Sequence, residues 1–185
     1  MRSPKIPRDE LLGRCSKVFK RFGYHGTTMD ALAAECELNK ATFYHHYSNK
    51  VSLMSDILKW SHERIGQALF SIAYDEKLPA AERLALMSRK SKKLFQEGSI
   101  GCLMGVIAID ATYSVASLVP QIRDFMDDWS NALAFIFAAH MDEPHASAAA
   151  RQTVADYEGA ILLSRIYKDM SFFDRVAERS MNLVA

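Results

Sequence analysis

The chain of 185 residues lacks long apolar runs and is poor in cysteine. Its longest apolar run, residues 133–139 with a small extension on either side, falls far short of the ~20 residues that cross a bilayer. The first residues contain no apolar stretch that ends in a cleavage site, so we expect a cytoplasmic protein. The three cysteines, Cys15, Cys36 and Cys102, have no metal-binding or redox spacing, which predicts reduced thiols.

Excess charge of either sign is also nearly absent, because the net charge is only +1. Over the whole chain this balance argues against a nucleic-acid-binding protein. The positive charge is, however, concentrated at one end. Residues 1–50 hold nine Lys or Arg against five Asp or Glu, net +4, whereas residues 51–185 hold fourteen against seventeen, net −3. The first fifty residues are therefore the part suited to an anionic partner.

Strand-like alternation of apolar and polar residues persists nowhere, and glycine and proline only punctuate the chain. Between them the apolar residues recur every three or four positions, which is the period of an α-helix. This pattern predicts an all-α fold of about nine helices, over residues 8–22, 29–36, 40–46, 48–74, 80–97, 102–114, 119–141, 146–168 and 172–184. The residues expected to separate these helices include Gly23, Gly98, Gly101, Pro120 and Pro144.

Two short helices joined by a tight turn lie within the basic N-terminal part. Thr27 or Thr28 is placed to cap the first of them, and Asn39 is placed to cap the second. Such a pair predicts a helix-turn-helix, whose second helix enters the DNA major groove with short polar or methyl-bearing side chains. Phe43 and Tyr47 are four residues apart, so we expect both to face inward and to anchor this helix.

The remaining side chains of the second helix have the chemistry that base and phosphate contacts require. Those expected to face outward are Lys40, Ala41, Thr42, Tyr44 and His45. Lys40 can donate to O6 and N7 of guanine, and the methyl groups of the next two residues can contact a thymine methyl. Tyr44 and His46 are better placed for phosphates, together with Lys50 at the start of the next helix.

The stretch from Arg8 to Met54 carries a series of short words in a fixed order. These are Phe22-Gly23-Tyr24, Gly26-Thr27-Thr28-Met29, Leu32-Ala33, Thr42-Phe43-Tyr44-His45-His46-Tyr47, Asn49-Lys50 and Leu53-Met54. The stretch resembles the DNA-binding domain of the tetracycline-repressor (TetR) family. The resemblance implies a helix-turn-helix domain of three helices over residues 1–50 and a helical ligand-binding and dimerisation domain over residues 51–185. It also implies DNA contacts at Thr28, Asn39, Lys40, Ala41, Thr42, Tyr44, His45, His46 and Lys50.

Two positions depart from the family pattern. Glu37 lies in the turn where members usually have a glycine, so its backbone is expected to be left-handed or strained. Val51 and Ser52 replace the acidic residues that often suit the helix start there. Neither departure affects a residue expected to contact bases.

The second half resembles the family only at Gly101-Cys102-Leu103-Met104 and around residues 157–165, which are similar to one subgroup. That subgroup pairs its last two helices into a four-helix dimer bundle. The resemblance therefore implies a homodimer interface at Val154, Tyr157, Ile161, Arg165, Phe173 and Val176. A dimer is also expected because one recognition helix contacts few bases, and two must lie roughly 34–36 Å apart on a pseudo-palindromic operator.

Large aromatic and methionine side chains recur at helical spacing in the second half, and most are expected to form the core. A subset is expected to line an apolar cavity for a small-molecule effector of unknown identity. The candidates are Trp60, Phe70, Met87, Met104, Ile107, Tyr113, Phe125 and Trp129. Cys102, at the start of a helix, is compatible with a sensor thiol and with a small buried residue.

These observations together predict a ligand-responsive transcriptional regulator, in the first place a repressor released from its operator by the effector. One alternative is a helical-bundle ligand carrier or enzyme with an incidental helix-turn-helix, and another is a family member that activates transcription. The sequence contains no convergent nucleophile and base, no phosphate-binding loop and no metal-ligand spacing. We therefore expect no catalytic residue, no cofactor, no metal and no membrane partner.

Overall fold

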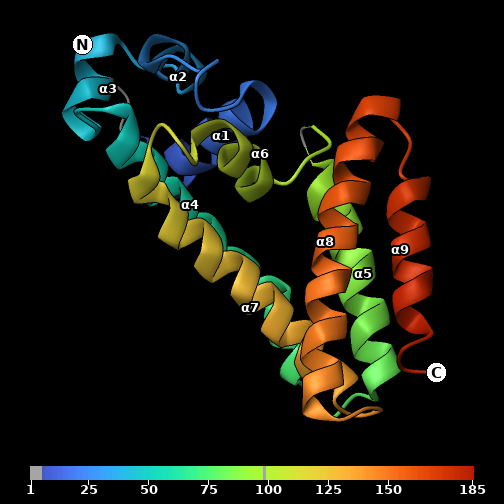
Figure 1. Cartoon of the computed structure of the whole chain (residues 1–185). Helices are drawn as coiled ribbons and strands as arrows, with labels where there is room; N and C mark the ends of the chain where they lie inside the picture. Colours follow the sequence, from blue (N-terminus) through green and yellow to red (C-terminus); the bar gives the residue numbers. More distant parts are fainter. Residues whose placement is uncertain (1–5, 98) are drawn as a thin grey trace. The chain divides into compact units, whose positions relative to one another are not determined.

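The computed structural model describes residues 6–97 and 99–185, and all regular structure in these residues is helical (Figure 1). The elements in order are α1 (Arg8–Phe22), α2 (Met29–Glu35), α3 (Lys40–His46), α4 (Lys50–Ala68), η1 (Phe70–Tyr74), α5 (Ala80–Gln96), α6 (Leu103–Ala111), η2 (Ala116–Leu118), α7 (Val119–Phe137), α8 (Glu143–Tyr167) and α9 (Ser171–Met181). The expected all-α fold is confirmed over the described residues. Residues 1–5 of the expected DNA-binding domain and the expected helix break at Gly98 lie outside them.

Capping side chains set where the two short helices begin. The hydroxyl oxygen of Thr28 accepts a hydrogen bond from the backbone N–H of Ala31 at 3.1 Å, and the side-chain oxygen of Asn39 accepts one from Thr42 at 2.8 Å. Each bond satisfies an N–H that has no partner within its helix. The α1 helix ends at Phe22, and the next residue, Gly23, has a φ of 75°, which glycine adopts without strain. The expected boundaries at these caps are confirmed.

Some expected helices are shorter in the structure, and two begin earlier, α8 at Glu143 and α9 at Ser171. The helix expected over 48–74 ends at Ala68, and a 3-10 helix with i to i+3 bonds follows, in which the N–H of Ile72 donates to Leu69. The helix expected over 119–141 ends at Phe137. Pro120 and Pro144 do not lie between helices. They lie in the first turns of α7 and α8, where a missing N–H would have had no helical partner.

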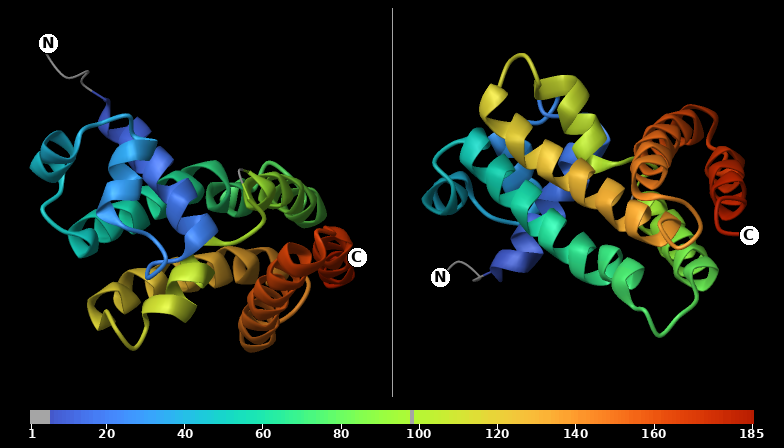
Figure 2. Two further views of the ribbon diagram at one scale, coloured as in Figure 1. Left: turned by 90° about the horizontal axis from the view of Figure 1, so that it is seen from above. Right: turned by 60° about the horizontal axis from the view of Figure 1, so that its bottom comes forward.

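The described residues form two packing units, and the first combines residues 6–62 with residues 103–123. Within it α1 contacts both α2 and α6, and α2 contacts α3 (Figure 2). Its fully buried side chains include Leu12, Phe19, Leu32, Phe43 and Ile57. The N-terminal helices therefore share a core with α6, which is distant from them in sequence.

The second unit combines residues 63–97 and 99–102 with residues 124–185. In this unit α8 lies along α9, and α5 contacts α9 and η1 (Figure 1). Aromatic rings pack against one another in its core. The ring centroid of Trp129 lies 5.8 Å from that of Phe95 and 5.7 Å from that of Tyr157. The centroids of Tyr157 and Phe173 are 4.7 Å apart. Among the described helices, none is both long enough and apolar enough to cross a bilayer.

Candidate nucleic-acid interface

The α3 helix presents polar side chains to solvent and one aromatic side chain to the core. Phe43 is fully buried, as expected from its spacing. The expected contact residues at exposed positions are Thr28, Asn39, Lys40, Ala41, Tyr44, His45 and His46, whereas Thr42 and Lys50 are half-buried. The first unit therefore holds all nine expected DNA-contact residues, seven of them exposed, on the start of α2, on α3 and at the start of α4.

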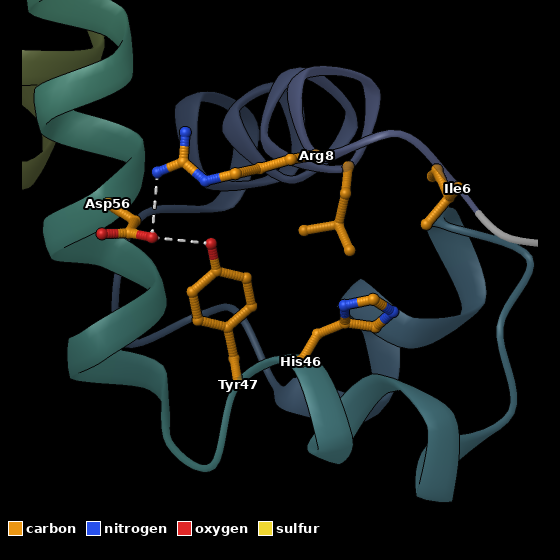
Figure 3. Close-up of a pocket in the computed structure, with 6 residues that line it drawn as sticks. Ile6, Arg8, His46, Tyr47 and Asp56 are labelled. Atoms are coloured by element: carbon orange, nitrogen blue, oxygen red, sulfur yellow. Dashed lines mark hydrogen bonds and ion pairs between the residues drawn. The ribbon is translucent and has the colours of Figure 1, made fainter.

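Tyr47 fixes the end of α3 to α4 through a carboxylate that the sequence pattern did not single out. Its hydroxyl donates to Oδ2 of Asp56 at 2.8 Å, and Arg8 at the start of α1 donates to the same oxygen at 3.1 Å (Figure 3). Ile6, Leu11 and these three side chains line a pocket of about 310 Å³ together with His46 (Figure 3). Asp56 thus holds the start of α1 and the end of the recognition helix in one position.

The same contacts shift the ionisation of both partners. Burial raises the pKa of Tyr47 to about 12, and the hydrogen bond to Asp56 adds to this shift. Burial alone would raise the pKa of Asp56, but the hydrogen bonds from Tyr47 and Arg8 lower it below its usual value. Asp56 is therefore ionised at neutral pH and Tyr47 keeps its proton, which is the state the hydrogen bonds require.

The turn between α2 and α3 contains the backbone strain that the sequence indicated. Glu37 has a φ of 56°, in the left-handed region, as expected for a position where glycine is usual. Arg14 of α1 donates to its carboxylate at 3.0 Å and to the carbonyl of Glu35 at 3.1 Å. The guanidinium of Arg14 thus ties α1 to the turn that sets the angle between the two short helices.

Lys40, expected to donate to guanine, has a partner within the protein. Its ammonium group is 2.5 Å from Oδ2 of Asp30 on α2, and both side chains are more than half exposed. An exposed ion pair of this kind is weak, since water screens it and two long side chains lose freedom. Lys40 can therefore exchange Asp30 for another acceptor at low cost.

Three of the expected contact residues converge on a second surface hollow. Thr28, Tyr44 and Lys50 line a shallow pocket of about 330 Å³, together with His25, Thr27, Met29 and Asp30. The three come from the start of α2, the middle of α3 and the start of α4. A hydroxyl, a phenol and an ammonium group are donors suited to phosphate oxygens.

Lys50 has a structural task that the sequence did not predict. Its ammonium group donates to the carbonyl oxygens of Tyr24 at 2.7 Å and Thr27 at 2.9 Å, and it lies 4.3 Å from the centre of the Tyr24 ring. Burial lowers the pKa of Lys50, and the charge of Asp110 opposes that shift. Two of its three protons are thus committed to the loop before α2. The backbone of this loop approaches itself so closely at Gly26 that a Cβ there would clash with the Phe22 carbonyl oxygen.

Asp110 of α6 is a further residue that sequence reasoning missed. Its Oδ2 accepts a hydrogen bond from the backbone N–H of His25 at 2.7 Å, and the His25 ring lies 2.9 Å from the hydroxyl of Ser114. These contacts join residues 85 and 89 positions apart. No short-range pattern could have indicated them, because they depend on how α6 packs on α1.

The residues expected to line an effector cavity are divided between the two units. Trp60, Met104, Ile107 and Tyr113 belong to the first unit, whereas Phe70, Met87, Phe125 and Trp129 belong to the second. In the second unit the rings of Phe70 and Phe125 are 5.4 Å apart and pack against each other. Tyr113 is 100% exposed. It lies in the turn after α6 ends at Ala111.

The residues expected at a dimer interface lie largely inside the second unit. Five of the six are buried in a single protomer: Val154, Tyr157, Ile161, Phe173 and Val176. Arg165 is half-buried. Tyr157 stacks on Trp129 and its hydroxyl is 3.2 Å from that of Ser88, so it belongs to the core. The large apolar side chains that α8 exposes are instead Leu162, Leu163, Ile166 and Tyr167.

Comparison with known sequences matches both halves of the chain to family models. Residues 14–57 match the model of bacterial regulatory proteins of the tetR family, and residues 80–179 match the model of the LmrA/YxaF-like transcriptional regulator C-terminal domain. The chain is 30% identical over 57 residues to the transcriptional regulator UidR of Escherichia coli, a match that covers 31% of this chain and 29% of UidR. It is 36% identical over 62 residues to the transcriptional activator FasR of Mycolicibacterium smegmatis, covering 31% and 28%. These matches thus span less than a third of either relative.

Solved structures match over almost the whole chain. A TetR transcriptional regulator from Legionella pneumophila aligns with a TM-score of 0.89 at 21% identity, covering 98% of this chain and 99% of that one. The TetR family regulator CifR, solved in the presence of operator DNA, aligns with a TM-score of 0.73 at 18% identity, covering 98% of both chains. At these identities the likeness shows a shared fold.

The second family model alone spans residues 80–179, more than half of the 185-residue chain, and the first covers the helix-turn-helix. Members of this family regulate transcription by binding DNA and are not enzymes, which removes the alternative of an enzyme with an incidental helix-turn-helix. The chain belongs to the TetR family of bacterial transcriptional regulators.

Proposed function

We propose that this TetR family regulator is a repressor that binds a pseudo-palindromic operator as a homodimer and leaves it when a small-molecule effector binds. Residues 1–50 would contact DNA, and residues 51–185 would bind the effector and the second protomer. We place its action in the cytoplasm, where a bacterial regulator meets DNA.

The observation that carries the DNA-binding role is the hollow where Thr28, Tyr44 and Lys50 converge beside the exposed side of α3. Capping bonds and the buried Phe43 hold α3 rigidly, while its N-terminal side chains stay exposed. A rigid helix with exposed donors and methyl groups is what major-groove contact requires. CifR, which shares this fold, was solved with operator DNA, and this supports the assignment.

A footprint on the region upstream of the protein's own coding sequence tests the proposal. We expect protection of two half-sites about one helical turn apart. Ala41→Glu places a negative charge on the exposed side of α3 and should abolish protection. Gln67→Glu makes the same change of charge at an exposed position on α4 and should leave protection intact. Absence of protection by the wild-type protein at modest salt would contradict the proposal.

A second copy of the chain is the proposed partner of the exposed apolar side of α8. Ile166 is 62% exposed and Tyr167 is 65% exposed, and Leu162 and Leu163 lie one turn earlier on the same helix. A cluster of large apolar side chains on one exposed helix surface is unusual for a monomer and typical of an interface. Two recognition helices on one operator also require a dimer.

The effector is proposed to act on the second unit, where aromatic rings supply an apolar environment. Phe70, Phe125 and Trp129 pack closely there, so a ligand would have to displace one of these side chains. Helix α4 runs from the first unit into the second, and we propose that it carries the change to the recognition helix. A thermal-shift screen for small molecules, followed by release of operator DNA, tests this step.

Activation of transcription is a second candidate, favoured by the match to FasR, whose name states that it is an activator. A promoter fused to a reporter separates the two. Deletion of the gene raises reporter output if the protein is a repressor and lowers it if the protein is an activator. Either result is compatible with the proposed DNA binding.

A further inference from the structure

Two of the three cysteines meet in the core of the first unit. Cys15 lies on α1 and Cys36 directly follows α2, and their Sγ atoms are 3.6 Å apart. Their side chains are 0% and 3% exposed, respectively. The two residues are 21 positions apart in the sequence and form no short motif, so only the packing of α1 on α2 brings them together.

The surroundings make one of the two thiols the better nucleophile. A hydrogen bond from Cys15 lowers the pKa of Cys36, and the charge of Arg14 lowers it further, although burial opposes both effects. The pKa of Cys15 is raised, chiefly by the hydrogen bond it gives to Cys36 and by burial. A thiol that ionises readily is the one that reacts with peroxides. Cys36 would therefore attack the peroxide first, and Cys15 would react afterwards with the oxidised Cys36 sulfur.

We propose that Cys15 and Cys36 form a peroxide-sensitive thiol pair whose oxidation to an intrachain disulfide weakens DNA binding. The second half of this statement rests on the proposed function above. Transient disulfides in reducing compartments are usually catalytic or sensory rather than structural, which fits a reversible role in a regulator.

The chemistry balances with a hydroperoxide as the two-electron oxidant. The Cys36 thiolate attacks hydrogen peroxide, which forms a sulfenic acid on Cys36 and releases hydroxide. The sulfenic acid carries no thiolate charge, so Cys15 can now lose its proton and attack the Cys36 sulfur. The S–S bond forms, the S–O bond breaks, and the oxygen leaves as water with the proton from Cys15. A dithiol reductant reverses the change through thiol–disulfide exchange.

The disulfide would act on the turn that positions the recognition helix. Bond formation brings the two sulfurs from 3.6 Å to about 2.05 Å, so at least one residue must move. Cys36 is followed by Glu37, with its left-handed backbone, and by Leu38, whose N–H donates to the carbonyl of Ala33 at 2.9 Å. A displacement of Cys36 should therefore shift the start of α3. Binding geometry tolerates displacements of only about 0.5 Å, so the affinity for DNA should fall.

The size of the oxidant matters because both sulfurs are buried. Hydrogen peroxide is little larger than water and can reach the pair during small openings between α1 and α2. A bulky aromatic disulfide reagent needs a much larger opening. We therefore expect rapid loss of the two thiols with peroxide and slow reaction with the bulky reagent in the folded protein.

The test uses the full chain, reduced and then treated with hydrogen peroxide. Trypsin digestion without reductant should yield one disulfide-linked pair of peptides, residues 15–17 joined to residues 22–40. The affinity for the footprinted DNA should fall at least about tenfold and return with dithiothreitol. Cys15→Ala and Cys36→Ala should each bind DNA and lose the response. Cys102→Ala, which changes the remaining cysteine, should keep it.

The outcomes separate this inference from the proposed function. A reduced protein that protects no DNA contradicts the proposed function, while the peptide analysis still tests the thiol pair. Sulfinic acid on Cys36 without a disulfide, or a disulfide that involves Cys102, overturns the inference. A Cys15–Cys36 disulfide that leaves the affinity for DNA unchanged overturns its regulatory part. Peptide mapping of the wild-type protein decides these points even if an alanine variant fails to fold.

Discussion

The ammonium group of Lys50 lies 2.7 Å from the carbonyl oxygen of Tyr24, and this contact joins the start of α4 to the loop that precedes α2. A second bond, to the carbonyl of Thr27, fixes the residue immediately before the capping Thr28. Lys50 therefore positions Thr28, a residue that we propose to contact DNA, as well as offering its own charge. Substitution of Lys50 should therefore affect both the stability of the protein and its affinity for DNA.

We expect Lys50→Met to lower the affinity for all DNA sequences and also to lower the melting temperature by about 3–6 °C, because two charge-assisted hydrogen bonds are lost. The slope of log affinity against log salt should change by less than one, since one ammonium proton at most faces a phosphate. Lys77→Met, which removes a charge from an exposed loop position, is the control. An unchanged melting temperature with a full unit of salt slope would assign Lys50 to phosphate alone.

The pair of Lys40 and Asp30 predicts opposite effects of two substitutions. Lys40→Ala should lower affinity and relax the preference at one or two base pairs by about tenfold, because a donor to guanine is lost. Asp30→Asn should raise affinity, because it releases Lys40 from an intramolecular partner and removes a negative charge beside the DNA. Binding to a panel of operator variants measures both. Uniform weakening by Lys40→Ala would make it a phosphate contact.

Asp56 makes the position of α3 sensitive to acid. Its folded-state pKa lies below that of the unfolded chain, so its stabilisation is present above the unfolded pKa near 4 and is lost as the pH falls through the lower folded value. Asp56→Asn should lower the free energy of unfolding by about 1 kcal/mol at pH 7, a value reduced for partial exposure. The difference from wild type should shrink toward pH 3. Urea titrations at both pH values measure it, with Asp124→Asn at an exposed position as control.

The sequence predicts features that depend on nearby residues, but it does not predict contacts between residues that are far apart in the chain. The caps Thr28 and Asn39 and the buried Phe43 follow from neighbours within four residues, and all three are found in the structure. The left-handed backbone of Glu37 follows from the resemblance to the family, and it is found as well. The contact of Asp110 with His25 spans 85 residues and depends on helix packing, which the apolar period does not specify. The same holds for the meeting of two cysteines that show no motif.

Helix α8 illustrates a different limit. It carries apolar side chains on two sides, one with Tyr157 and Ile161 and another with Leu162 and Ile166. Periodicity shows that both sides are apolar, but it cannot tell which one faces α5 and α9 within the protomer. The α8 residues expected at the dimer interface include Tyr157 and Ile161, which lie on the side that is buried within the protomer.

Glu37 allows the strain in the helix-turn-helix turn to be measured. Glu37→Gly and Glu37→Ala both remove the contact with Arg14, so they differ only in the backbone. Because the φ of 56° disfavours any residue with a Cβ, Glu37→Gly should be more stable than Glu37→Ala by about 1 kcal/mol. Denaturant unfolding compares the two variants directly. Equal stabilities would show that the turn relaxes to another conformation.

The two sides of α8 give a matched pair of substitutions for the proposed dimer. Ile166→Glu changes a side chain that is 62% exposed, so the protomer should stay folded and its helical circular dichroism should be retained. A charge in the centre of an apolar interface has no partner and is costly to bury, so the protein should sediment as a monomer. Operator affinity should then fall steeply, because one recognition helix alone contacts few bases.

The partner substitution tests the core assignment of the neighbouring residue. Ile161 is 2% exposed, and Ile161→Ala should lower the free energy of unfolding by about 2–5 kcal/mol through the cavity it leaves. At a temperature where this variant is still folded, it should sediment as a dimer. If Ile166→Glu remained dimeric while Ile161→Ala became monomeric at unchanged stability, the interface would lie on the side of α8 that the resemblance first implied.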